Sequence, residues 1–185
     1  MIVGEFKIRT SQDLLKGLNA RNGTYILVFE LKSDYRLMVG RLGVFTFPAG
    51  WYCYSGSALG PGGLAGRLRH HLKIADRAHW HMDFLRPLGC IREIWYGRAP
   101  FYNEHRWAEN LRAMTDTPAI APGFGSSDCG CETHLVRFDA YPSIARFRRR
   151  QPVGSGIRRP PVYRMAVDDI LSYGKGRKNT KTVRK

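Results

Sequence analysis

The segment that most constrains the fold is residues 24–31, TYILVFEL, in which only one residue of eight is charged. Its β-branched and aromatic content is typical of a buried strand. The polar residues Lys32, Ser33 and Asp34 follow as a turn, and we expect residues 35–42 to return as a second strand that pairs with the first. The fold is therefore expected to begin with a β-hairpin whose first strand lies in the core.

Strands and helices alternate along the rest of the chain. Glycine and proline clusters separate the apolar segments, and apolar residues recur at helical spacing in two places. Further strands are predicted at residues 44–47, 51–56, 90–96 and 134–138, and helices at residues 12–18, from residue 64 onward, and at 103–114. This order predicts an α/β (α+β) fold with a small, mainly antiparallel central sheet flanked by helices.

The length of 185 residues suits one domain, and the charge is unevenly distributed along it. Residues 141–185 hold 13 Lys and Arg against 2 Asp and Glu, whereas residues 1–140 hold 17 against 13. We expect an N-terminal extension (1–20), a folded domain (21–140), and a basic linker with a disordered tail (141–185). Such a basic segment indicates a polyanionic partner, and the alternative is a solubilising tail.

No apolar run reaches the length of a membrane span, and the N-terminus lacks the pattern of a secretory leader. We therefore expect a cytoplasmic protein without a membrane contact, with a monomer as the default state. The four cysteines are few and irregularly spaced, so in a reducing compartment they are expected to be thiols or metal ligands.

The helix that follows the glycine-rich residues 60–63 carries polar residues at its core margin. Arg67 and His71 are four positions apart, so they share one helix face beside the leucine stripe. Near a helix N-terminus and a sheet rim, this pair could cradle a phosphate or an oxyanion. The alternative is that Arg67, Arg69, His70 and His71 form a solvated basic face.

Two tyrosines lie on predicted strands near these residues. Tyr25 follows Gly23 and Thr24, and Tyr54 precedes Ser55 and Gly56. Tyrosines on strands usually serve packing with a solvated hydroxyl. Antiparallel pairing of the two strands would bring both phenols to the same region of the sheet.

The segments GTY, YCYSGSA and GLAGRLRHH resemble the GIY-YIG nuclease superfamily in order and spacing. The elements HWHMDFL, EHRWA and GFGSSDCGCETHLV are similar to one uncharacterised branch of it, found as small stand-alone proteins and, in some archaea, fused to DNA glycosylase-lyases. The resemblance covers residues 21–140 and implies a GIY-YIG-like fold. Ser55 stands where the superfamily usually has an apolar residue.

The resemblance implies that Tyr25 and Tyr54 bracket a scissile phosphate and that Arg67 neutralises its developing charge. A helix glutamate would hold one divalent cation, Mg²⁺ or Mn²⁺. Glu104 is followed at the third and fourth positions by an aromatic residue and alanine, as in the superfamily, whereas Glu109 is not. Glu104 is thus the expected ligand, and its alternative role is an exposed acid paired with an arginine.

The implied function is a metal-dependent endonuclease that hydrolyses phosphodiester bonds in DNA, in a repair context. The general base is either a tyrosine or His71. The alternatives are a non-catalytic nucleic-acid-binding module, with RNA also open as the ligand, and an accessory protein of a repair enzyme. The expected DNA contacts are Arg69, His70, Arg148, Arg149, Arg150, Arg158 and Arg159.

A second set of side chains with metal-ligand chemistry lies outside the superfamily motifs. Its members are His79, His81, Asp83, Asp128, Cys129, Cys131 and His134. These nitrogen and sulfur donors would suit structural zinc, but C-x-C is a tighter spacing than usual and no second cysteine pair exists. We therefore favour hydrogen bonds that hold the GFGSSDC loop on the core, with an aspartate near substrate. Cys53 and Cys90 are expected in the core.

Overall fold

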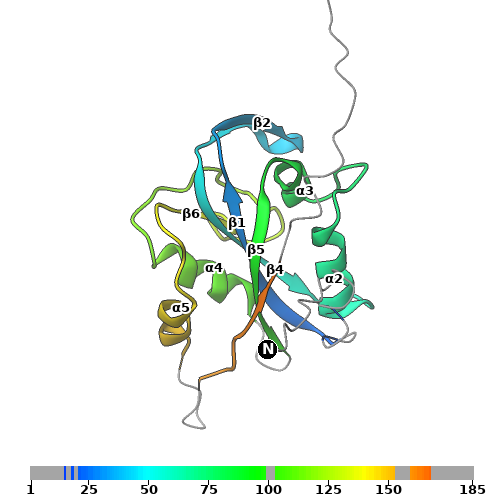
Figure 1. The fold of residues 1–185 in the computed structure, drawn as a ribbon, viewed down its shortest axis with the longest axis vertical. Helices are drawn as coiled ribbons and strands as arrows, with labels where there is room; N and C mark the ends of the chain where they lie inside the picture. Colours follow the sequence, from blue (N-terminus) through cyan, green and yellow to red (C-terminus); the bar gives the residue numbers. More distant parts are fainter. Residues whose placement is uncertain (1–14, 16–17, 19–20, 99–102, 153–158, 168–185) are drawn as a thin grey trace, which may run out of the picture.

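A computed structural model of the chain describes residues 15, 18, 21–98, 103–152 and 159–167. At its centre, an antiparallel sheet has the strand order β6-β4-β1-β5-β7 (Figure 1). The five strands are β1 (Gly23–Leu31), β4 (Gly50–Ala58), β5 (Cys90–Arg98), β6 (Leu135–Phe138) and β7 (Tyr163–Ala166). The expected α+β fold with a mainly antiparallel central sheet is confirmed.

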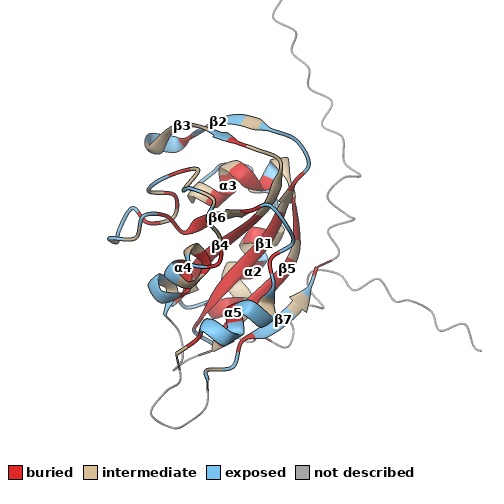
Figure 2. Ribbon diagram, turned by 90° about the vertical axis from the view of Figure 1, so that its left-hand side faces the viewer, coloured by how far each residue is buried: buried red, intermediate tan, exposed pale blue. Residues whose placement is uncertain are grey.

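β1 occupies the middle of the sheet, and this position accounts for its apolar sequence. It is hydrogen-bonded to β4 on one side and to β5 on the other, and eight of its nine residues are buried. Successive side chains point to opposite faces. Accordingly Tyr25 and Leu27 join one hydrophobic cluster, while Ile26 and Val28 join another. Both faces of the sheet are covered, as the buried strands in Figure 2 show.

Helices cover both faces of the sheet. The first cluster includes leucines from α2 (Gly63–Leu72) and α3 (His81–Leu85), and the second includes residues of α4 (Glu104–Arg112) and α5 (Ile144–Arg150). A short 3₁₀ helix, η2 (Arg86–Leu88), joins α3 to β5. Within the described residues, no helix has the length and apolar character needed to cross a membrane.

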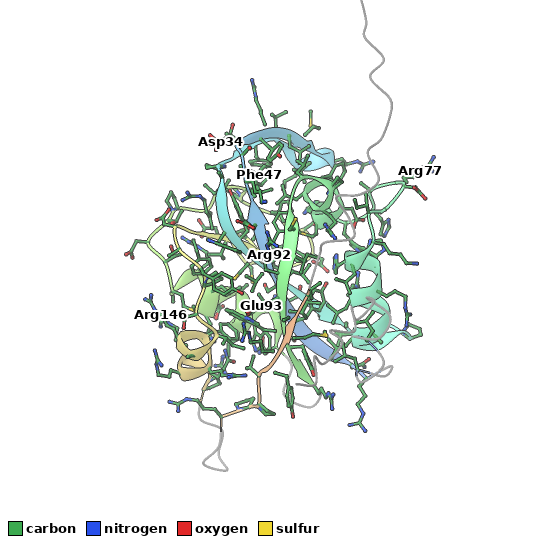
Figure 3. All side chains as sticks on the ribbon, in the orientation of Figure 1. Asp34, Phe47, Arg77, Arg92, Glu93 and Arg146 are labelled. Carbon is green, nitrogen blue, oxygen red and sulfur yellow. The ribbon has the colours of Figure 1, made fainter. Side chains whose placement is uncertain are left out.

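The expected pairing of the first strand with residues 35–42 is wrong. β2 (Tyr35–Val39) and β3 (Gly43–Phe47) flank the 3₁₀ helix η1 (Gly40–Leu42) and pair with each other in a separate two-stranded sheet. β1 has no free edge for β2, because β4 and β5 already pair with both of its edges. Phe47, at the end of β3 (Figure 3), packs edge-on against Tyr52 and Phe124 and joins this hairpin to the core.

The C-terminal region differs from the expected extended linker. Ser143 caps α5 by accepting a hydrogen bond from the Arg146 amide, and β7 pairs with β5 at the edge of the sheet. Buried Glu93 of β5 (Figure 3) accepts hydrogen bonds from Trp95 and from Arg164 of β7. These tertiary contacts hold β7 in the sheet, so the strand forms although its own sequence carries no strong strand pattern. Most of the expected helix at residues 12–18, and residues 168–185, lie outside the described residues.

Candidate functional site

A cleft of about 520 Å³ opens where the outer edge of β4 loses its partner strand. β6 pairs with β4 only as far as Tyr54, so residues 56–58 of β4 pair with β1 alone. Side chains from both faces of the sheet therefore reach the same space. The residues named from the sequence that line it are Tyr25, Tyr54, Arg67, His79, His81, Glu104, Asp128 and His134.

The strand register places the two tyrosines together. Tyr25 lies opposite Gly56, and Tyr54 lies opposite Leu27, so both phenols are on the same face and one diagonal step apart. Gly56 makes this possible, because a Cβ there would come within 2.4 Å of the Tyr25 hydroxyl. The glycine of the Y-x-G motif thus gives the Tyr25 ring room to lie across β4.

Tyr25 is hydrogen-bonded to a histidine of α2. Its hydroxyl lies 2.7 Å from His71 Nε2, and His71 is only 2% exposed. Arg67, one turn earlier on the same helix face, is half-buried and lines the cleft. Buried Arg86 donates to the His71 carbonyl oxygen at 2.8 Å and fixes the end of α2.

Burial controls protonation in this group. It lowers the pKa of His71 to about 3, with His70, Arg67 and Arg86 adding to the shift and Asp83 opposing it. His71 is therefore neutral at physiological pH. Burial likewise raises the pKa of Tyr25 and of Tyr54 above the ordinary value, and the nearby Arg67 charge only partly offsets it. Both phenols are therefore protonated at physiological pH.

Trp80 organises the rim of the cleft next to Arg67. The Arg67 guanidinium carbon lies 4.0 Å from the centre of the Trp80 ring, and the His70 ring is 4.3 Å from it. Asp83 accepts hydrogen bonds from the Trp80 amide at 2.9 Å and from His70 Nε2 at 2.8 Å. Those bonds outweigh the effect of burial and lower the pKa of Asp83. Trp80 is a cleft residue that was not among the site residues predicted from the sequence.

Glu104 reaches the cleft from the other face of the sheet. It begins α4, directly after the cap Asn103, and its Oε1 lies 3.0 Å from His134 Nδ1. Burial raises its pKa, but hydrogen bonds with His134 and Ser57 outweigh burial and place that pKa below the ordinary value. The carboxylate is ionised and lines an open cleft, so it suits a divalent cation. Glu109 is exposed and lies outside the cleft lining.

The second set of predicted residues divides into two groups. Cys129, Cys131 and His134 come together with His105 of α4, and one donor atom of each lies within 4.8 Å of the others, so this cluster could hold a metal ion. Of the remaining predicted residues, His79, His81 and Asp128 line the cleft, and Asp83 binds His70 and the Trp80 amide. His81 Nδ1 also accepts a hydrogen bond from the Gly125 amide at 2.8 Å and holds the GFGSSDC loop on α3. His105 was missed as a donor because its partners are more than twenty residues away.

The residues expected to contact DNA have several environments. Arg69 and Arg149 are exposed, His70 is bound to Asp83, and Arg158 lies outside the described residues. Three others donate to backbone carbonyl oxygens and so help to hold the C-terminal region: Arg148 to Val162, Arg150 to Ala113, and Arg159 to Gln151. Because Ala113 follows the last turn of α4 and Glu104 begins α4, α5 lies at the end of α4 remote from the cleft.

These features define a small α+β domain with a cleft of charged and aromatic residues beside a possible metal-binding cluster. Residues 24–151 match the model of a family described as Domain of unknown function DUF123, so the chain belongs to this family. No curated protein and no solved structure matches the chain.

Proposed function

We propose that this protein is a metal-dependent endonuclease of the GIY-YIG type that hydrolyses phosphodiester bonds in DNA, in the context of DNA repair. One observation carries the proposal. Tyr25, Tyr54 and Arg67 from one face of the sheet and the ionised Glu104 from the other line a single cleft. A proton-transfer group, a cation for the phosphate and a carboxylate for a metal ion are the groups that metal-dependent phosphodiester hydrolysis uses.

Arg67 is the group best placed to bind the phosphate. Its guanidinium stacks on Trp80 at 4.0 Å, which orients the planar fork without neutralising its charge. A guanidinium held in this way can donate to two phosphate oxygens and stabilise the charge that develops on them. Tyr54, whose high pKa keeps it protonated, can donate a further hydrogen bond.

Tyr25 and His71 form a hydrogen-bonded pair. Because His71 is neutral, its Nε2 can accept a hydrogen bond from the Tyr25 hydroxyl at 2.7 Å and so fix the position of that hydroxyl in the cleft. A water molecule beside Tyr25 would lose its proton to the phenol oxygen only once a bound cation has lowered the pKa of Tyr25 and the phenol has been deprotonated. Tyr25 is therefore the candidate general base, and His71 is the residue that positions it.

Glu104 is the residue that would hold the divalent cation, with Asp128 as a second carboxylate on the same cleft. Mg²⁺ and Mn²⁺ suit one or two carboxylates together with water and phosphate oxygens. When bound, the cation supplies positive charge to the leaving oxygen and lowers the pKa of nearby groups. In its absence, the high pKa of Tyr25 opposes formation of a phenolate.

DNA is the proposed partner because the protein has a net charge of +15. Lys and Arg residues that neutralise phosphates release counterions and give a strong, salt-dependent attraction. The exposed Arg69 on α2 and Arg149 on α5 supply charge on both sides of the sheet.

A second candidate is a nucleic-acid-binding module without catalysis, acting alone or as an accessory of a repair enzyme. The observation in its favour is the burial of both tyrosines, which raises their pKa and leaves neutral phenols in the cleft. Neutral phenols can bind a phosphate without acting on water.

A cleavage assay separates the two candidates. The full-length protein is incubated with duplex, nicked, flapped and branched DNA in Mg²⁺, in Mn²⁺ and in EDTA. We expect cleavage that requires the cation and whose rate at saturating DNA falls strongly in Arg67→Ala, while Arg69→Ala, the neighbouring exposed arginine of α2, weakens DNA binding but keeps that rate.

The same preparations are tested for DNA binding by fluorescence anisotropy. If the wild type binds all four DNA forms but cuts none of them with either ion, the nuclease proposal is wrong and the binding module stands. If Arg67→Ala and Arg69→Ala lose cleavage to the same extent, the assigned role of Arg67 is wrong.

A further inference from the structure

We propose that His105, Cys129, Cys131 and His134 hold a structural zinc ion, in a site separate from the cation expected at Glu104. Two histidines and two cysteines form one of the common donor sets of four-coordinate zinc. One donor atom of each residue lies within 4.8 Å of the others. The chain therefore brings a full set of four protein ligands to one point.

The separations between the donors fit a tetrahedral ion. Cys129 Sγ is 3.5 Å from His134 Nε2, and Cys131 Sγ is 3.5 Å from His105 Nδ1. Zinc bonds to sulfur and to imidazole nitrogen, arranged tetrahedrally, place such atoms about 3.6 Å apart. Both sulfur–nitrogen pairs already have this spacing, and the other separations between donor atoms are at most 4.8 Å.

The surroundings of His134 give a second, independent indication. Its Nδ1 lies 3.0 Å from Glu104 Oε1, and its side chain is only 1% exposed. A carboxylate next to one ring nitrogen fixes the proton there and leaves the other nitrogen free to bind a metal, an arrangement found around most zinc-binding histidines. The free nitrogen here is Nε2, the one that faces Cys129.

A metal ion at this site would tether the long loop that connects α4 to β6. Residues 115–134 connect α4 to β6 without a described helix or strand, an unusually long connection for a compact domain. Phe124 and the His81–Gly125 hydrogen bond hold one part of the loop on the core. An ion bound by His105 and both cysteines would join the rest of the loop to the first turn of α4.

Four protein ligands leave no position for water or substrate, so the role is structural and not catalytic. The short C-x-C spacing does not oppose this assignment, because the two histidines come from separate elements and complete the tetrahedron. Through His134, the ion also fixes the carboxylate of Glu104 at the edge of the cleft.

The first test is the metal content of the full-length protein, purified without chelator and without an affinity tag. We expect about one zinc ion per chain by mass spectrometry of the metals. The double variant Cys129→Ser/Cys131→Ser and the variant His105→Ala should lose it. Cys90→Ala and His79→Ala are the matched controls, because neither residue belongs to the cluster, and they should keep it.

The second test uses the unaltered chain and so does not depend on whether the variants fold. Replacement of the bound metal by Co²⁺ should give the visible absorption of a tetrahedral ion together with a sulfur-to-cobalt charge-transfer band. Chelation should lower the melting temperature and re-addition of zinc should restore it. A wild type that binds no zinc when it is supplied, an octahedral cobalt spectrum, or equal zinc content in the site variants and the controls would each overturn the proposal.

Discussion

Glu104 Oε1 lies 3.0 Å from Nδ1 of His134, and this contact joins the cleft to the His/Cys cluster, two of whose members, His105 and His134, also line the cleft. The carboxylate lines the cleft together with Tyr25 and Arg67, and it is also in contact with the His/Cys cluster through His134. One glutamate thus faces both the expected cation and the proposed zinc site. Variants of Glu104 are informative only if both sites are measured.

Glu104→Gln should abolish most of the cleavage activity while leaving the zinc content unchanged. The amide keeps the shape of the side chain but removes the charge that holds a divalent cation, a loss expected to lower the rate about 10²–10³-fold. Two thiolates and two imidazoles should retain zinc without the carboxylate. Cleavage rates and metal content are compared with Glu109→Gln, an exposed glutamate of the same helix. Equal cleavage by the two variants would show that Glu104 is not the cation ligand.

His71 should make the stability of the protein depend on pH in the acidic range. Its folded pKa of about 3 lies below the unfolded value of about 6.5, so the unfolded chain takes up the proton first. The stabilisation is complete above about pH 6.5 and is lost as the pH falls toward 3. Denaturant unfolding of His71→Gln between these pH values should show a shallower pH dependence than the wild type. The exposed His79→Gln is the control, and identical slopes in all three proteins would contradict the assignment.

Two glycines near the cleft should respond in opposite ways to alanine. In Gly56→Ala the new Cβ would come within 2.4 Å of the Tyr25 hydroxyl, so the ring must move, at a cost of about 1–3 kcal/mol and with loss of the Tyr25–His71 hydrogen bond. In Gly66→Ala the Cβ meets open space within α2, and the free energy of unfolding should rise by about 0.5–1 kcal/mol. Chemical denaturation measures both. Stabilisation by Gly56→Ala would mean that Tyr25 does not lie across β4.

Truncation should distinguish the basic tail from the folded domain. Removal of residues 168–185 takes away six Lys and Arg, and the slope of log affinity against log salt should fall by about 0.9 for each phosphate that these residues neutralise. Replacement of the same six residues by glutamine is the matched control and should have the same effect. Removal of residues 150–185 should in addition destabilise the domain, because β7 and the partner of buried Glu93 leave with them. A salt slope unchanged by the shorter cut would place the DNA contacts within residues 1–167.

The parts of the site that follow from local periodicity could be predicted from the sequence. Alternation along strands brings Tyr25 and Tyr54 to one face, and a four-residue spacing brings Arg67 and His71 to one side of α2. The residues that follow Glu104 favoured it over Glu109 as the expected cation ligand, and of these two glutamates only Glu104 lines the cleft.

The features that were missed depend on contacts between distant parts of the chain. His105 becomes a potential ligand only when residues 129–134 fold back on α4, and no local pattern signals this. The pairing of β1 was misjudged because the nearest segment in sequence, residues 35–42, is not its neighbour in the sheet. The high tyrosine pKa values likewise depend on how completely the tertiary fold excludes water.

The central position of β1 determines how the cleft can move. All nine of its residues are paired with β4 and eight with β5, so their amide groups can reach solvent only when one of the two pairings opens along its length. In native-state hydrogen exchange such strands are the last to exchange, at rates set by unfolding of the whole domain. Tyr25 belongs to this slow unit, whereas Asp128 and Ser127 come from a loop without regular structure. The cleft therefore combines residues that move only when the whole domain unfolds with residues whose positions depend on the few contacts that hold one loop.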